Sequence, residues 1–512
     1  MAQAPTFAPP ASTTLSQRLV RNAGANLVRM LSFGIVAIVL PMVLVRHLPP
    51  ASYNAWILIL QLGAYVNFLD LGIQTALSKY VAEYDATGDR RGCDRVTANG
   101  LFLLLITAAL GTIFTFGMGL SVSHLFPQMP PDLVIEVRWA IIFYGFSMAL
   151  SLPASAFAGI FLGLQRNAVP MFLQSSNKLL TGLVTIACVL LHTRIRVMGM
   201  SVAAVNIAFA LAQVISWKAL ANHIQVRYNL VDRKTISTLL RYCAVLTLWG
   251  VAGLFVSGFD TIIVGHFDFH ATAYYAASAN ATSFLSALLA VVTSPLIPAT
   301  SALSVHQSPQ RLGNLLLRAT RYNVAFMLIA GLPLLIFSFL VLRTWMGNNF
   351  ALQGVPFLRL LLIGVMVRLI GLPYAVMVIG TAKQWVATLS PICEAVVNFT
   401  VSLILVQKIG AVGVAWGTLI GAFVSIGLHF TVSMYYTRDK LAISRRRLVV
   451  RGVLLPLAAA IPTALAVRYW WGTNAIPTLS PLAWTALALS TAALLWFVTL
   501  DSYARNKLLR RA

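Results

Sequence analysis

The chain has 512 residues, of which 59% are hydrophobic and 10% are charged. Soluble domains carry about 25% charged residues, so this composition excludes a water-soluble globular protein and indicates a polytopic membrane protein. The formal net charge of +24 arises from 37 Lys and Arg against 13 Asp and Glu. Basic cytoplasmic loops explain most of this excess in a membrane protein, so nucleic acid is not an expected partner.

The first 17 residues are predicted to form a disordered cytoplasmic tail, because they lack the basic start and apolar run of a cleaved signal peptide. About fourteen apolar segments follow, each near the roughly 20 residues that a membrane-crossing helix needs. They lie near residues 24–46, 53–76, 97–123, 139–163, 168–191, 197–220, 240–265, 273–300, 321–343, 355–380, 385–407, 411–435, 450–469 and 480–500. We therefore predict an all-α integral membrane protein with about 14 transmembrane helices.

Basic residues concentrate in the loops on one side of these segments, most densely in TRDKLAISRRRLVVR and the C-terminal ARNKLLRRA. The positive-inside rule makes that side cytoplasmic, and an even number of spans places both termini there. The loops are short, and the sequence contains no GxxxxGK phosphate loop, no HExxH and no Cys/His metal spacing. Neither ATP hydrolysis nor a metal or other cofactor is expected.

The two halves of the chain resemble each other at an offset of about 215–225 residues. The matched pairs, in order, are VRHLPPASYNAW with VGHFDFHATAYYA, TALSKY with SALSVH, GLQRNAVPMF with GTAKQWVATL, and VMGMSVAAVNIA with AVGVAWGTLIGA. The copies lie six helices apart and therefore have the same orientation. This pattern predicts two parallel-repeat six-helix lobes around a central cavity.

The predicted lobes cover residues 18–235, with helices 1–6, and 236–437, with helices 7–12. Residues 438–512 then add helices 13 and 14 and a basic tail, for which peripheral packing is the simplest role. A small set of ionisable residues lies inside the predicted spans. Each costs about 2.5–3.5 kcal/mol on insertion scales if it faces lipid, so these residues should face the bundle interior or a watery cavity. They are Arg29, Asp70, Lys178, Asp260, Arg368 and Glu394.

Four stretches carry a resemblance to a known family: FLDLGIQTALSKYVAEYDATGD, FDTIIVGHF, LRTWMGNNF and EAVVNFTVSLILVQKIGAVGVAWGTLIGA. Together with the architecture, they resemble the polysaccharide transporter branch of the MOP superfamily, which contains the Wzx-type flippases. The resemblance covers most of residues 18–436. Its most specific element is the helix with Glu394 and Asn398 that precedes a Gly- and Ala-rich helix.

The resemblance implies a non-enzymatic flippase of the bacterial inner membrane that works by alternating access. Its cargo would be an undecaprenyl-diphosphate-linked oligosaccharide, moved from the cytoplasmic to the periplasmic leaflet for O-antigen, exopolysaccharide or capsule synthesis. Membrane lipids are the expected surroundings, and a polysaccharide polymerase and a chain-length regulator are further candidate partners. We expect a monomer.

The three intramembrane cations suit this cargo, because Arg binds phosphate oxygens bidentately and Lys acts as a point charge. We predict that Arg29, Lys178 and Arg368 line a cavity that binds the diphosphate or acidic sugars. The alternative is that some of them pair structurally with Asp70, Glu394 or backbone carbonyls. For Arg29, a further alternative is that it snorkels to lipid phosphates.

Glu394 has two functional interpretations and one structural interpretation. The repeat aligns it with Asn177, next to Lys178. It either balances the charge of the cavity cations or binds a coupling proton or Na⁺. The structural alternative is a hydrogen bond with Asn398.

The two aspartates inside the spans are also candidates for coupling or charge balance. Asp70, in the FLDLG sequence near the inner surface, has capping or ion pairing as its structural alternative. Asp260 lies just before a repeated turn, so it either contacts the cavity mouth or fixes that turn.

Two other classes of protein are less compatible with this sequence. A membrane glycosyltransferase or polymerase needs a sizeable periplasmic loop with catalytic residues, and the outer loops here are short. A MATE-like multidrug exporter favours an acidic cavity, because its cargo is usually cationic. The basic residues inside the spans therefore favour the flippase.

Overall fold

The structure, a computed structural model, describes residues 15–306, 309–381, 383–458, 460–461, 488–489 and 491–492. Every regular element in these ranges is a helix, which confirms the all-α prediction. Eleven helical segments in the described ranges are long and apolar enough to cross a membrane. The chain divides into an N-terminal unit, residues 1–250, and a C-terminal unit, residues 251–512.

Three of the predicted spans are not among these eleven. The second half of the span near 450–469 and most of the span near 480–500 lie outside the described residues, as do the N-terminal tail up to residue 14 and the basic C-terminal tail. The span near 240–265 is interrupted by a π-helical turn, η3, between α9 and α10. The count of 14 therefore stays a prediction.

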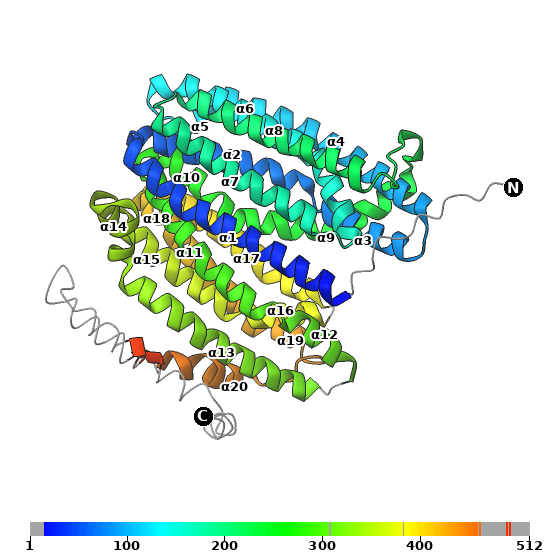
Figure 1. Cartoon of the computed structure of the whole chain (residues 1–512). Helices are drawn as coiled ribbons and strands as arrows, with labels where there is room; N and C mark the ends of the chain where they lie inside the picture. Colours follow the sequence, from blue (N-terminus) through cyan, green and yellow to red (C-terminus); the bar gives the residue numbers. More distant parts are fainter. Residues whose placement is uncertain are drawn as a thin grey trace. The chain divides into compact units, whose positions relative to one another are not determined.

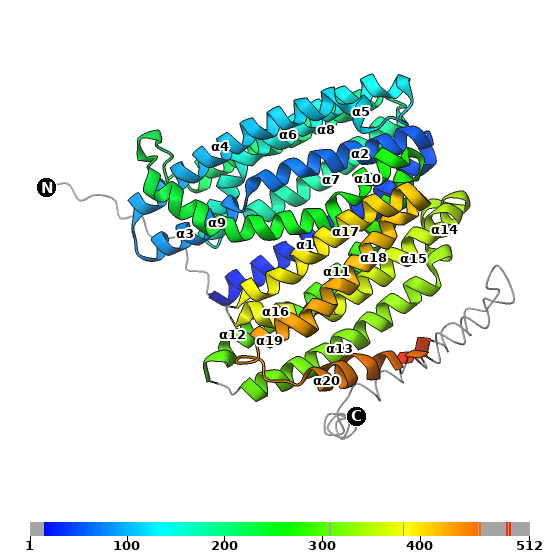
Figure 2. The same ribbon diagram turned by 180° about the vertical axis from the view of Figure 1, so that it is seen from behind.

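The N-terminal unit is built from long helices joined by short turns (Figures 1 and 2). The second crossing is broken between α2 and α3, where Leu71 and Gly72 have φ angles of 51° and 79°. Glycine adopts this left-handed conformation without strain, whereas leucine does so at a cost. The elements are α1 (Leu15–His47), α2 (Pro50–Asn67), η1 (Phe68–Asp70), α3 (Ile73–Ala86), α4 (Arg90–Leu120), α5 (Val122–Leu125), α6 (Pro131–Gly163), α7 (Ala168–Leu190), α8 (Ile195–Leu220), η2 (Tyr228–Leu230) and α9 (Arg233–Gly253).

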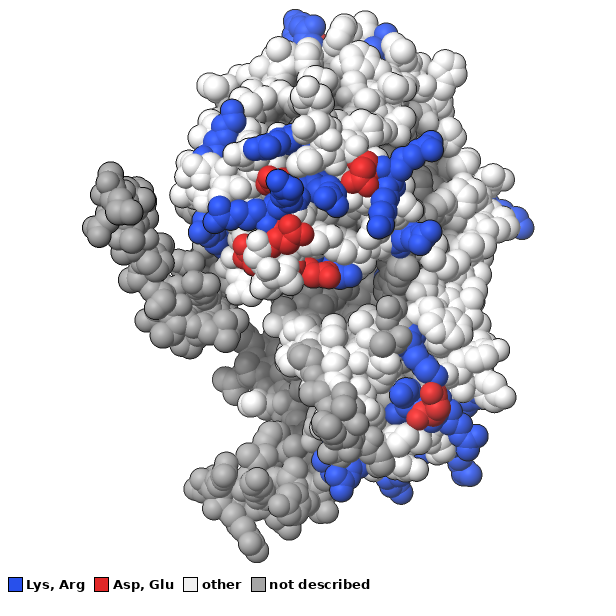
Figure 3. All heavy atoms as spheres, turned by 90° about the vertical axis from the view of Figure 1, so that its right-hand side faces the viewer, with Lys and Arg blue, Asp and Glu red and all other residues white. Residues whose placement is uncertain are grey.

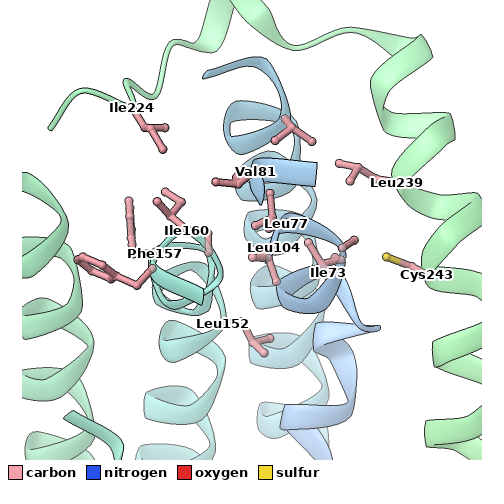
Figure 4. Packing of buried hydrophobic residues seen from close by; sticks show 14 of the residues in the cluster. Ile73, Leu77, Val81, Leu104, Leu152, Phe157, Ile160, Ile224, Leu239 and Cys243 are labelled. Atoms are coloured by element: carbon pink, nitrogen blue, oxygen red, sulfur yellow. The ribbon is translucent and has the colours of Figure 1, made fainter. Parts of the chain in front are cut away.

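The core of this unit surrounds α3 (Figure 4). Ile73, Leu77 and Val81 recur every four residues and form one buried face of that helix. This face packs against α4, α6 and the first half of α9, which contributes Leu239 and Cys243. The first half of α9 therefore packs with the N-terminal unit, and the units divide at residue 250, downstream of the expected lobe boundary at 235.

The C-terminal unit follows the same scheme with more interruptions. Its elements are η3 (Leu254–Gly258), α10 (Asp260–Phe267), η4 (Phe269–Ala271), α11 (Thr272–Thr293), α12 (Leu296–His306), α13 (Pro309–Ile336), α14 (Ser338–Met346), α15 (Asn348–Ile370), α16 (Leu372–Gly380), α17 (Gln384–Ile409), α18 (Val412–Leu428), η5 (His429–Ser433), α19 (Met434–Tyr436), α20 (Arg445–Arg447) and η6 (Leu448–Leu454).

The two units repeat one packing pattern. In the N-terminal unit α1 packs on α7, while α2, α4 and α8 all pack on α6. In the C-terminal unit α10 packs on α17, while α11, α13 and α18 all pack on α15. The break between α2 and α3 recurs as a break between α11 and α12. This correspondence is what a duplicated six-helix lobe predicts.

The break between α15 and α16 has an identifiable cause. Pro373 has no N–H to donate to the carbonyl of Leu369, one helical turn before it. The Asn323 side chain on α13 donates to that carbonyl instead, at 2.8 Å, and both groups are buried. Gly371, at the break, lies under the ring of His429, where a Cβ atom would come within 2.9 Å of it. The chain thus bends here without leaving the carbonyl unsatisfied.

Charged side chains gather at the ends of the helices. Figure 3 shows one face of the molecule on which Lys and Arg outnumber Asp and Glu. In the N-terminal unit Arg90, Arg91 and Arg95 are exposed at the start of α4. In the C-terminal unit Lys383 pairs with Asp439 at 2.6 Å. These clusters lie in loops that the sequence assigns to the cytoplasmic side.

Candidate functional site

A cavity of about 520 Å³ lies inside the N-terminal unit, between α1, α2, α6, α7 and α8. Its wall mixes aliphatic, aromatic and neutral polar side chains with two cations. None of the described lining residues is acidic. This combination gives the cavity a positive charge and many hydrogen-bonding groups.

The two cations of the cavity are Arg29 on α1 and Lys178 on α7. Both are half-buried and lie near the same aromatic ring. The Arg29 guanidinium carbon is 5.8 Å, and the Lys178 ammonium nitrogen 5.5 Å, from the centre of the Phe33 ring. Cation–π attraction at such distances holds each cation against the ring. Two of the three predicted cavity cations therefore line one cavity.

The polar lining of α7 follows a helical stripe. Gln174, Asn177, Lys178, Thr181 and Thr185 all line the cavity. Gln174, Lys178, Thr181 and Thr185 recur at intervals of three or four residues, which places them on one face of the helix, with Asn177 beside Lys178. Asn177, predicted as a polar partner, thus belongs to the cavity wall. Sequence reasoning identified Asn177 and Lys178 but missed the other three members, which are visible in the sequence as a polar face on an otherwise apolar helix.

Other helices add neutral polar groups that the sequence did not single out. Asn206 on α8 is buried, lines the cavity and donates to the Ser147 hydroxyl at 3.2 Å. Trp56 on α2 also lines it and is 1% exposed. The Trp56 indole nitrogen has no hydrogen-bond partner within the described chain. A buried donor without a partner is uncommon and costly, so this wall group is suited to a ligand or water.

Asp70 lies apart from these lining residues. It ends the 3-10 turn η1, where the Ser155 hydroxyl donates to its carboxylate at 3.1 Å. Ser155 belongs to α6, so the contact ties the break after α2 to its neighbouring helix. This position fits the capping alternative for Asp70.

In the C-terminal unit Arg368 on α15 pairs with Glu394 on α17. The Arg368 Nε atom is 2.5 Å from the Glu394 Oε1 atom, and the Glu394 side chain is 3% exposed. The Arg368 Nη2 atom is buried without a hydrogen-bond partner among the described residues. The structure therefore brings this predicted cavity cation together with the predicted charge-balancing carboxylate, and leaves one guanidinium donor to spare.

Asp260 is the centre of a second buried group. It is 2% exposed and accepts from the Tyr275 hydroxyl at 2.8 Å, the Thr418 hydroxyl at 3.0 Å and the Asn398 amide at 3.2 Å. The Asn398 amide also donates to the carbonyl of Val256 at 2.8 Å. The Asn398 amide thus donates to Asp260 and Val256, and not to Glu394 as the structural alternative for Glu394 required.

The helices α17 and α18 approach closely enough to build this group because α18 is rich in small residues. An added Cβ at Gly421 would come within 3.1 Å of the Asn398 Cβ atom. Close packing of this kind is typical of small residues at helix interfaces in membranes. It brings Thr418 on α18 within reach of Asp260 on α10. Sequence reasoning did not identify Tyr275 and Thr418 as part of this group, because they belong to helices that only the fold brings together.

Known proteins support this architecture. The family model described as "Polysaccharide biosynthesis protein" matches residues 19–304, more than half of the chain. No curated protein matches the chain. Among solved structures, the lipid II flippase MurJ in an inward closed conformation has 13% sequence identity and a TM-score of 0.70, and the match covers 94% of this chain and 99% of MurJ.

Two further solved structures are similar. An inward-facing multidrug resistance MATE family transporter of the MOP superfamily has 16% identity and a TM-score of 0.65, covering 80% of this chain and 97% of its own. A MOP superfamily transporter from Pyrococcus furiosus has 16% identity and a TM-score of 0.53, covering 82% and 95%. At such identities the likeness shows the fold alone. The chain therefore belongs to the polysaccharide biosynthesis protein family and has the fold of the MOP superfamily transporters.

Proposed function

We propose that the protein is a flippase that moves an undecaprenyl-diphosphate-linked oligosaccharide from the cytoplasmic to the periplasmic leaflet of the bacterial inner membrane. The observation that carries this proposal is the cavity of the N-terminal unit, with Arg29 and Lys178 in its wall and no acid among its described lining residues. The family description and the likeness to a lipid II flippase support the same class of cargo.

The charge of the cavity is what a diphosphate needs. An anion that leaves water loses its hydration, and nearby cations offset that loss. A cavity of about 520 Å³ has the size of a small-molecule pocket, so it suits a diphosphate with its first sugar better than a whole oligosaccharide. A multidrug exporter with cationic cargo gains nothing from these two cations, and the cavity therefore favours the flippase.

Two carboxylates of the C-terminal unit have different proposed roles. Glu394, bound to Arg368, balances a cation while no cargo is present. Asp260 accepts hydrogen bonds from two hydroxyl groups and one amide, and none of these donors in the described part of the chain is a cation, so Asp260 is the proposed site for the coupling proton or Na⁺. Ion-coupled alternating access then arises because loading of Asp260 changes the packing of α10 against α17 and α18.

The proposal is tested by replacing Lys178 in a bacterium that depends on this protein for its surface polysaccharide. Lys178→Ala should abolish surface polysaccharide while the protein still inserts, and its control is Lys218→Ala, an exposed basic residue outside the cavity. Normal polysaccharide in the Lys178→Ala strain, at normal protein level, would overturn the proposal. We also propose that both termini are cytoplasmic, which reporter fusions at each end test. A polysaccharide polymerase and a chain-length regulator are proposed partners, and co-purification with the protein tests them.

A further inference from the structure

The cavity of the N-terminal unit extends along its helices. Lys178 and Thr185 on α7 both line it, and seven residues of helix at 1.5 Å per residue separate them by about 10 Å. Phe33 on α1 lies beside Lys178, and Val36 lies 3.2 Å from where a Cβ atom of Gly182 would be. Helices α1 and α7 therefore run in parallel along the cavity, so a residue on one helix can be assigned the same height along the cavity as its neighbour on the other.

One end of the cavity holds both cations. Arg29, Phe33 and Lys178 meet there, and Gln174 and Asn177 lie within one turn of Lys178 on α7. We refer to these five residues as the cation level. Its ammonium, guanidinium and amide donors are the groups that bind phosphate oxygens.

The other end is uncharged. Leu40, seven residues beyond Phe33 on α1, lines it together with Thr185. Trp56 belongs to the same end, because α2 begins at Pro50 directly after the turn that follows α1. We refer to Leu40, Trp56 and Thr185 as the neutral level. Trp56 is 1% and Thr185 is 2% exposed, so this level is narrow, and its wall contains a hydroxyl and the Trp56 indole N–H, which has no partner within the described chain.

We propose, on the basis of the flippase function above, that the cavity binds its cargo in one orientation and selects an uncharged first sugar. The diphosphate lies at the cation level and the sugar attached to it lies at the neutral level. There the Trp56 N–H donates to a sugar hydroxyl or acetamido oxygen and relieves the cost of a buried, unpaired donor. An acidic first sugar is disfavoured, because the neutral level holds no cation to offset the loss of hydration.

Binding measurements on the purified full chain in lipid nanodiscs separate the two levels. Three probes are compared by calorimetry: a short prenyl diphosphate, the same lipid carrying one N-acetylglucosamine, and the same lipid carrying one glucuronic acid. The variants are Trp56→Phe, which removes the N–H and keeps an aromatic ring, and Lys178→Met. The control is Trp217→Phe, because that indole donates to the Ile224 carbonyl and does not line the cavity.

Loss of one hydrogen bond to the ligand should weaken binding by about tenfold. Trp56→Phe should therefore weaken the N-acetylglucosamine probe about tenfold and leave the sugar-free diphosphate unchanged. Lys178→Met should weaken both, Trp217→Phe neither, and the wild-type chain should bind the glucuronic acid probe less tightly than the neutral one. If Trp56→Phe lowers the melting temperature, Thr185→Val provides the same comparison at the same level.

The outcomes distinguish the two proposals. If Lys178→Met weakens both probes while the neutral-level variants weaken neither, the cationic cavity stands and the sugar level is wrong. The orientation is likewise wrong if the neutral-level variants weaken both probes equally. If Lys178→Met changes neither probe, the diphosphate site itself, and with it the proposed function, is overturned.

Discussion

The guanidinium of Arg368 on α15 and the carboxylate of Glu394 on α17 form a hydrogen-bonded ion pair, with the Nε and Oε1 atoms 2.5 Å apart. The pair joins two helices of the C-terminal unit, and its carboxylate is almost completely buried. Arg368 is 28% exposed, so one side of the pair remains open. A buried charge that loses its partner lowers the free energy of unfolding, so the contribution of the pair can be tested by measuring protein stability.

Glu394→Gln should destabilise the protein, because it leaves the Arg368 charge without its partner. Breaking a fully buried pair costs about 3–5 kcal/mol, and the partial exposure of Arg368 lowers the expected loss to about 1–3 kcal/mol. Thermal unfolding in detergent measures it. The double variant Arg368→Gln with Glu394→Gln removes both charges and should recover much of the loss. A double variant less stable than both single variants contradicts a specific pair.

Asp260→Asn should remove the dependence of transport on the ion gradient. The amide retains the size of the carboxylate but carries no charge to bind a proton or Na⁺. Tyr275→Phe is the matched control, because it deletes one donor to Asp260 and retains the charge. Transport by Asp260→Asn that still follows the gradient in proteoliposomes would assign coupling to another group.

Asn323→Leu should destabilise the bend between α15 and α16, because it leaves the buried Leu369 carbonyl without a donor. The expected loss is about 1–3 kcal/mol in thermal unfolding. Pro373→Ala in the same variant restores a backbone N–H that can bond to this carbonyl, so the double variant should be more stable than Asn323→Leu alone. Equal stability of the two argues that the carbonyl does not need this donor.

The Lys383–Asp439 pair outside the membrane spans predicts a small pH effect. The hydrogen bond and charge of Lys383 lower the pKa of the Asp439 carboxyl below its ordinary range. Because the pKa of Asp439 is lower in the folded state than in the unfolded state, its charge stabilises the folded protein at neutral pH. This contribution is lost as the pH falls through the folded-state pKa. Since the Asp439 side chain is 56% exposed, Asp439→Asn should cost less than about 1 kcal/mol at pH 7. The difference from wild type should vanish in acid; a difference that persists there is not due to this charge.

The sequence was sufficient for the membrane class, the helical repeat and the cations, because apolar length and the cost of a charge in lipid are local properties. Arg29 and Lys178 were recognised for that reason, and they share a cavity. Contacts between distant helices were harder to predict. A hydrogen bond between Asn398 and Glu394 was one alternative from the sequence, because the two residues lie one turn apart on the same helix, but the Asn398 amide donates to Asp260 on α10.

Neutral groups were missed because they leave no strong signal in an apolar helix. Trp56 had no charge to mark it, and only its position in the cavity wall and its unpaired N–H identify it. Leu239 and Cys243 fall within the lobe predicted for the second copy, yet they pack into the core around α3.

Translocation by the purified protein tests the cationic cavity most directly. Proteoliposomes with wild-type protein should move a fluorescent prenyl-diphosphate-linked oligosaccharide between leaflets, measured by its accessibility to an external quencher. Lys178→Ala should reduce the initial rate at least tenfold, while Lys218→Ala should leave it unchanged. Wild-type rates in the Lys178→Ala vesicles would contradict the account of the cavity as the path of the diphosphate.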